Sequence, residues 1–242
     1  MNQAARTSAE VSANSHIVRL QNLTKIYQRG KVEVRAVHDV TMDIHTGDFA
    51  ALCGPSGSGK TSLLNLIGGL DVPTSGKVWV DGSDLVTLDR TALSEIRKNR
   101  IGFVFQAYNL IPVMTAFENA EFVLNLQGKS EDECRDRVMA ILKAVGLEGL
   151  EQRRPDEMSG GQQQRVAIAR AIVTGPAIVL ADEPTANVDS ETAESLLDMM
   201  FRLNAEEGIT FLFSTHDQHV MDRARRIIRV HDGQIESEEV RQ

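Results

Sequence analysis

The chain has 242 residues, of which 42% are hydrophobic and 25% charged, a composition ordinary for a globular protein and compatible with one α/β core. Its formal net charge of −8 argues against a nucleic-acid-binding surface, because such a surface needs clustered lysines and arginines. No stretch approaches about 18 consecutive apolar residues, so the sequence predicts no membrane-spanning helix.

The amino-terminal part divides into a tail and a β-rich region. Residues 1–15 are small and polar and lack an apolar segment, which predicts a disordered tail and no secretory signal. We expect residues 16–242 to form one domain. Between Ile17 and Phe49, alternating stretches such as Val32–Val40 predict strands.

An apolar strand predicted at Phe49–Cys53 is followed by the sequence GPSGSGKT and then by an apolar helix. This is the pattern of a phosphate-binding loop, in which glycines let backbone N–H groups approach phosphate oxygens at a helix N-terminus. Lys60 adds a positive charge for the β- and γ-phosphates, and the Thr61 hydroxyl is placed to ligate Mg²⁺. The pattern therefore predicts a nucleotide-binding loop made of Gly54, Pro55, Ser56, Gly57, Ser58, Gly59, Lys60, Thr61 and Ser62.

A mainly helical stretch follows the strand predicted at Ile101–Phe105 and extends to Ser159. Its clearest helix follows Ser130, which forms a capping box with Glu133, and Gly146 ends it. Cys53 and the cysteine in this helix, Cys134, have no metal-ligand spacing and are expected to be free thiols.

Strands and helices alternate again in the carboxyl-terminal part. The strand predicted at Ile178–Leu180 leads to two carboxylates, and open α/β sheets bind ligands outside the carboxyl ends of their strands. Asp182 would hold Mg²⁺ through its water shell, and Glu183 would orient and deprotonate the attacking water as general base. The basic run Arg223–Arg226 is short and is expected to be a solvated face.

The segment Met158–Gln162, Met-Ser-Gly-Gly-Gln, matches the signature of the ATPase subunits of ATP-binding cassette transporters, with methionine in place of leucine. That replacement conserves volume and is expected to be tolerated. The chain resembles this family from about Ile17 to Ile235. The resemblance implies an α/β fold with a P-loop NTPase (RecA-like) core that hydrolyses ATP, an amino-terminal antiparallel β-subdomain and an α-helical subdomain inserted at about 107–160.

The resemblance also implies roles for further residues. Tyr27 would stack on the adenine, Gln106 would reach Mg²⁺ and the attacking water, and His216 would contact the γ-phosphate. Asp189 lies in a loop that would touch the opposite subunit. The expected Mg²⁺ site thus comprises Thr61, Gln106 and Asp182, and the expected catalytic residues are Glu183, His216 and Gln106.

A single cassette implies a second copy of itself as partner, because in the resembled family two chains sandwich two ATP molecules head to tail. Ser159 and the backbone amides of Gly160 and Gly161 would bind the γ-phosphate held by the other subunit, and Gln162 belongs to the same site.

Residues 107–119 are apolar around a proline and too irregular for one amphipathic helix. They form either a packed loop or, as we prefer because they follow Gln106, a groove that receives a helix of a transmembrane permease. Leu110 and Val113 are expected to be exposed apolar positions in that groove.

The amino-acid sequences of Gly68–Gly76 and Ile101–Gln106 are similar to those of a subgroup of bacterial ATPases that includes lipoprotein-releasing, macrolide-exporting and cell-division cassettes. We expect an ATPase on the cytoplasmic face of the inner membrane that drives a permease in export of lipoproteins, lipids, peptides or drugs, or in mechanotransmission. The alternative is a regulator of envelope or cell-division enzymes that transports nothing. A cassette acting on DNA or ribosomes is disfavoured by the acidic charge and the single cassette.

Overall fold

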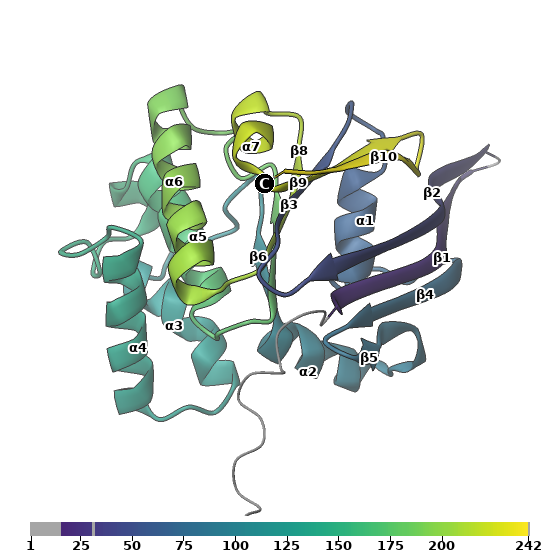
Figure 1. The fold of residues 1–242 in the computed structure, drawn as a ribbon. Coiled ribbons are helices and arrows are strands. Elements are labelled where there is room, and N and C mark those ends of the chain that lie inside the picture. The colour runs from purple at the N-terminus through teal and green to yellow at the C-terminus, as the bar shows by residue number, and fades with distance from the viewer. Residues whose placement is uncertain (1–15, 31, 242) are drawn as a thin grey trace, which may run out of the picture.

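A six-stranded, mostly parallel sheet forms the centre of the protein in the computed structural model, which describes residues 16–30 and 32–241 (Figure 1). The tail expected at 1–15 lies outside the described residues. The strand order is β10-β9-β3-β8-β7-β6, and only β9 and β10 pair antiparallel. The strands are β3 (Phe49–Cys53), β6 (Ile101–Val104), β7 (Ile178–Asp182), β8 (Phe211–Thr215), β9 (Arg226–His231) and β10 (Gln234–Val240).

The register of this sheet brings three strand ends together. Cys53 at the end of β3 pairs with Thr215 at the end of β8, and Asp182 at the end of β7 pairs with Ser214. Every residue of β3 and β8 is buried, as expected for central parallel strands covered on both faces. The loops that follow β3, β7 and β8 therefore meet at one edge of the sheet.

A second sheet, antiparallel and in the order β2-β1-β4-β5, contains the amino-terminal strands. Its alternating pattern buries one face, and apolar residues of β1, β2 and β4 share a core with Leu63 and Ile67 of helix α1. These findings confirm the fold class expected from the sequence. The strands are β1 (His16–Arg29), β2 (Val32–His45), β4 (Ser75–Val80) and β5 (Ser83–Asp84).

Helices cover both faces of the six-stranded sheet. Helix α1 lies between the two sheets, and α5, α6 and α7 pack on the other face (Figure 1). No described helix has the length and apolarity needed to cross a bilayer. The helices of the α/β part are α1 (Lys60–Ile67), η1 (Leu85–Thr87), α2 (Arg90–Arg100), α5 (Gly160–Ile172), α6 (Ser190–Glu207) and α7 (Gln218–Arg223).

Between β6 and α5 the chain forms α3 (Ala116–Leu126), α4 (Glu131–Ala144) and the short helix η2 (Pro155–Glu157). The predicted capping box is present, since the Ser130 hydroxyl accepts the Glu133 N–H and the Glu133 carboxylate accepts the Ser130 N–H. The helix ends two residues before Gly146, whose φ is +78°. Both cysteines are buried and free.

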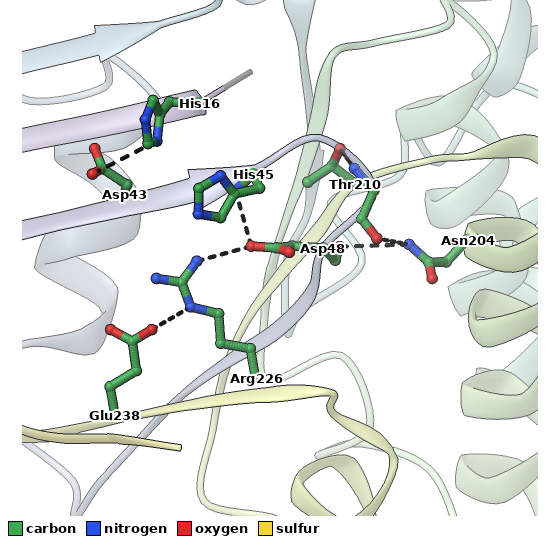
Figure 2. A network of polar contacts seen from close by, with 9 residues as sticks. His16, Asp43, His45, Asp48, Asn204, Thr210, Arg226 and Glu238 are labelled. Atoms are coloured by element: carbon green, nitrogen blue, oxygen red, sulfur yellow. Dashed lines mark hydrogen bonds and ion pairs between the residues drawn. The ribbon is translucent and has the colours of Figure 1, made fainter. Parts of the chain in front are cut away.

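The expectation that Arg223–Arg226 is a solvated face is wrong for Arg226, which is only 9% exposed. Its Nη1 donates to Asp48 Oδ2 at 2.9 Å and its Nε to Glu238 Oε1 at 2.6 Å (Figure 2). The physical reason is the position of Arg226 at the start of β9, a strand paired on both sides by β10 and β3, where two carboxylates compensate the desolvation of its guanidinium.

The turn that contains Asp48 joins the two sheets to α6 (Figure 2). The Asp48 carboxylate accepts the His45 N–H at 2.9 Å, and Asn204 on α6 donates to the Gly47 carbonyl at 2.9 Å. The Gly47 N–H donates to the Thr210 hydroxyl. This network lies at the amino ends of β3 and β9, so it braces the end of the sheet away from the candidate site.

Candidate nucleotide site

The loop predicted to hold phosphate turns from β3 into α1. A Cβ on Gly54 would lie 2.1 Å from the Val230 carbonyl oxygen, and one on Gly59 would lie 2.2 Å from the Ala36 carbonyl oxygen. Only glycine fits at these two positions. Gly59 is the N-cap of α1 and makes no side-chain cap, so the first N–H groups of the helix are available to an anion.

Lys60 lies buried behind this loop. Its Nζ donates to the carbonyl oxygens of Gly54 at 2.7 Å and Pro55 at 3.0 Å, which do not neutralise its charge. The nearby Ser58 hydroxyl is buried and has no hydrogen-bond partner among the described residues. A cation, an unpaired hydroxyl and the start of a helix in one loop fit a phosphate group.

Thr61 and Asp182 lie side by side at the same edge of the sheet. The Thr61 hydroxyl donates to Asp182 Oδ1 at 3.2 Å. A hydroxyl and one carboxylate are the donor set with which proteins hold Mg²⁺ beside a nucleotide, since phosphates and water complete its shell. The described residues contain no cluster of three or more His, Cys, Asp or Glu that would hold a metal alone. The pair thus fits Mg²⁺ bound together with phosphate.

Glu183 and His216 form a direct pair that joins the loops after β7 and β8. Glu183 Oε1 lies 2.7 Å from His216 Nδ1, and its Oε2 accepts the Thr215 hydroxyl at 3.4 Å. The Glu183 side chain is 16% exposed and the His216 side chain 70% exposed. Glu183 also has a left-handed φ of +47°, and its N–H donates to the Ser214 carbonyl. The carboxylate is thereby oriented by two groups, which suits a general base.

The signature residues begin α5. Ser159 is the N-cap: its hydroxyl accepts the Gln162 N–H at 3.3 Å, and the Gln162 side chain accepts the Ser159 N–H at 2.9 Å. Ser159 is exposed, whereas Met158 packs into the core as expected from its apolar character. A Cβ on Gly161 would lie 2.3 Å from the Thr192 methyl carbon, so α5 and α6 approach closely there. The first turn of α5 directly follows the exposed Ser159, so the helix N-terminus lies beside an exposed residue.

Gln106 and Asp189 lie in two loops that are joined to each other. β6 ends at Val104, so Gln106 is the second residue of the following loop. Gln106 is exposed, and its carbonyl accepts the Asn187 amide at 2.7 Å. Asp189 caps α6, and the Thr192 N–H and hydroxyl hold the pKa of its carboxyl below the usual value. Contact of Asp189 with a second subunit stays a prediction.

Tyr27 lies half-buried on β1. Its hydroxyl donates to Asp71 Oδ2 at 2.8 Å, Lys25 Nζ lies 4.9 Å from its ring centre, and burial raises the pKa of the phenol. Lys25 also pairs with Asp71 at 2.6 Å, so the ring is fixed from one side. Its stacking on adenine stays a prediction.

Sequence reasoning missed two buried amides that hold these loops. Gln164, fully buried on α5, donates to the Pro184 carbonyl at 2.8 Å and so ties the signature helix to the residue after Glu183. Asn119, also fully buried, donates to the carbonyls of Ile111, Met114 and Thr115. Helical spacing places Gln164 on the same face as the apolar residues of α5 and so predicts that it is buried. Spacing does not predict which group its amide would bond.

Comparison with known proteins identifies the family. The family model described as ABC transporter matches residues 37–186. The chain is 44% identical over 227 residues to the uncharacterized ABC transporter ATP-binding protein MJ0796 of Methanocaldococcus jannaschii, covering 92% of this chain and 97% of that one. It is 46% identical over 224 residues to the macrolide export ATP-binding/permease protein MacB of Syntrophobacter fumaroxidans, but there it spans only 31% of the relative.

Solved structures agree with this result. A dimeric structure of MJ0796 in a post-hydrolysis state, bound to ADP and Pi, has a TM-score of 0.86 at 44% identity and covers 93% of this chain and 99% of that one. CbiO1 of Clostridium perfringens, part of an ABC transporter complex, has a TM-score of 0.84 at 27% identity and covers 94% and 89%. The chain therefore belongs to the ABC transporter family, as one of its ATP-binding subunits that hydrolyse ATP.

Proposed function

We propose that two copies of this chain form an ATP sandwich and drive a transmembrane permease from the cytoplasmic face of the inner membrane. The observation that carries the proposal is that the chain presents the phosphate loop with its carboxylates and the signature turn as two separate parts of a nucleotide site. The phosphate loop, Asp182 and Glu183 lie at one sheet edge, while the signature turn of Ser159 is capped, exposed and equipped to bind an anion of its own. A head-to-tail second copy would bring such a turn to each phosphate loop. The dimeric MJ0796 structures support this arrangement.

The residues at the sheet edge divide the chemistry among them. Lys60 and the N–H groups of the loop and of α1 bind the phosphates. Mg²⁺, held by Thr61 and Asp182, would supply charge neutralisation on the phosphates. Glu183, oriented by His216, takes a proton from the attacking water, and the partner's signature turn excludes bulk water when the dimer closes.

The permease surface includes the loop before α3. Val113 in this loop is 73% exposed, whereas Leu110 packs against the core, so the expectation of an exposed Leu110 is wrong. The reason is that Asn119 pins the loop through three carbonyls, which holds one part of it against the molecule and leaves Val113 outward. Val113 is thus held outward on a fixed loop, where a partner could contact it, and this supports the docking surface.

The name of MacB, which joins ATP-binding and permease parts in one protein, supports a permease partner for this shorter chain. The cargo we propose is a lipoprotein, lipid, peptide or drug. The test is purification of the tagged chain from native membranes, followed by reconstitution of what co-purifies. A permease whose presence stimulates ATP turnover and moves solute is expected. A stimulated complex that moves none would favour the regulatory alternative, and no membrane partner would contradict the proposal.

A further inference from the structure

Tyr108 lies where three segments meet: the loop after β6, the loop before α6 and the first turn of α5. Its hydroxyl donates to the Asn187 carbonyl at 3.0 Å, and the Asn187 side chain donates back to the Gln106 carbonyl at 2.7 Å. A Cβ placed on Gly160 would lie 3.0 Å from the Tyr108 hydroxyl. Tyr108, which belongs to the loop after β6, thus bonds the loop that carries Asp189 and lies beside the first turn of the signature helix.

The backbone around Tyr108 is held in an unfavourable conformation. Tyr108 and Asn109 are consecutive left-handed residues, with φ of +58° and +50°. Such a conformation in a bulky residue persists where the surroundings impose it. Arg170 on α5 does so, because its Nη2 donates to the Tyr108 carbonyl at 2.9 Å and its Nη1 to the Asn109 carbonyl at 2.6 Å. The structure fixes where this ring points.

We propose that Tyr108 is a positioning residue for ATP hydrolysis: its hydroxyl fixes the backbone at Asn187 and sets the loop that presents Asp189 to the second subunit. This inference rests on the proposed dimer. Since Tyr108 belongs to segment 107–119, it also gives the permease surface a direct connection to the subunit interface. A movement of this segment on docking would be passed to the Asp189 loop through two hydrogen bonds at Asn187, one from the Tyr108 hydroxyl and one to the Gln106 carbonyl.

The substitution Tyr108→Phe removes the hydroxyl and keeps the ring, whose Cζ lies 3.9 Å from a Cβ placed on Gly160. The matched control is Thr87→Val, which removes a hydroxyl that donates to the Asp84 backbone carbonyl at 2.9 Å. Thr87 lies in η1, outside all three segments. A neutral hydrogen bond of this kind changes a local equilibrium about two- to tenfold.

The first measurement is amide hydrogen exchange in the nucleotide-free chain, which does not depend on dimerisation. The reporters are the N–H groups of Ala186 and Val188, which donate to the carbonyls of Glu183 and Thr185. Tyr108→Phe is expected to accelerate their exchange about two- to tenfold, and Thr87→Val to leave it unchanged. Unchanged exchange in Tyr108→Phe would overturn the inference whatever the fate of the proposed function.

The second measurement is the ATP-dependent dimer dissociation constant in a Glu183→Gln background. Tyr108→Phe is expected to raise it about two- to tenfold with monomer ATP affinity and unfolding midpoint unchanged. Dimerisation equal to that of the background would overturn the positioning role. A loss shared by Thr87→Val, or explained by weaker ATP binding, would do the same. Failure of Glu183→Gln alone to dimerise would count against the proposed function and leave the exchange result to decide the inference.

Discussion

At the scale of single residues, the phosphate loop could be predicted because its chemistry is local. Glycines, a lysine and a threonine within eight positions define the pattern, and the close approaches at Gly54 and Gly59 explain two of them. The contact between Glu183 and His216 could not be predicted, since they are 33 positions apart and meet only through the register of β7 and β8. Gln164 was missed for the same reason, since its partner Pro184 lies on a different element. Asn119 was missed because its partners are carbonyls of an irregular loop just before it, whose path the sequence pattern does not define.

Lys60→Ala is expected to lower ATP affinity about 100-fold or more and to abolish hydrolysis, because charge-assisted bonds to two phosphates are lost. Isothermal calorimetry with ATP checks the affinity. Lys98, which is partly exposed and pairs with Glu95, provides the control Lys98→Ala, expected to bind ATP normally. Parent-like binding and turnover by Lys60→Ala would refute the assignment of the loop.

Cys53 ends β3, and burial raises the pKa of its thiol from 9.0 to about 11. Because the folded-state pKa lies above the unfolded one, the stabilisation is complete below pH 9.0 and is lost as the pH rises toward about 11. The free energy of unfolding of the parent, relative to Cys53→Ala, should therefore fall by roughly 2 kcal/mol across this window. Denaturant titrations of both proteins at three pH values check it; a difference independent of pH would contradict the burial of this thiol.

At the scale of elements, helix ends could be predicted from adjacent residues, whereas ion pairs between distant segments could not. The capping box at Ser130 and the helix end near Gly146 depend on only a few adjacent residues, and the structure contains both. The burial of Arg226 cannot be predicted in this way, because its partners Asp48 and Glu238 belong to a distant turn and a neighbouring strand. A short basic run looks the same in sequence whether its members are solvated or paired.

Arg226→Met should destabilise the protein by about 2 kcal/mol, since it leaves two partly buried carboxylates without a cation. The matched change Arg223→Met removes an ion pair with Asp198, whose side chain is 65% exposed, and should cost less than about 1 kcal/mol. Urea unfolding of both variants gives the comparison. Equal losses of unfolding free energy in the two variants would mean that the ion pairs of Arg226 with Asp48 and Glu238 contribute little to stability.

At the scale of the whole molecule, the fold class followed from motif order, while the partner surface did not. The order of strand, phosphate loop, helical stretch, signature and acidic strand end predicts a sheet interrupted by helices, and that is the observed topology. Which residues of 107–119 face outward depends on how Asn119 holds the loop, so Leu110 and Val113 could not be told apart from the sequence.

Val113→Glu should weaken permease docking by placing an unpaired charge in a desolvated contact, while basal ATP turnover of the isolated chain persists. Val240→Glu is the matched control, because Val240 on β10 is equally exposed at 73%. Co-purification with the permease and stimulated turnover are measured for both. Normal docking by Val113→Glu, or an equal defect in Val240→Glu, would place the docking surface elsewhere.

The measurement that tests the central claim most directly is size-exclusion chromatography of Glu183→Gln with ATP and Mg²⁺. The account predicts that this variant binds ATP, does not hydrolyse it and elutes as a dimer, because reopening needs the proton transfer that the Glu183 carboxylate performs. Adding Lys60→Ala should return it to a monomer, since the phosphates are no longer held. A Glu183→Gln protein that stays monomeric with ATP, or that hydrolyses ATP at the parent rate, would contradict the account.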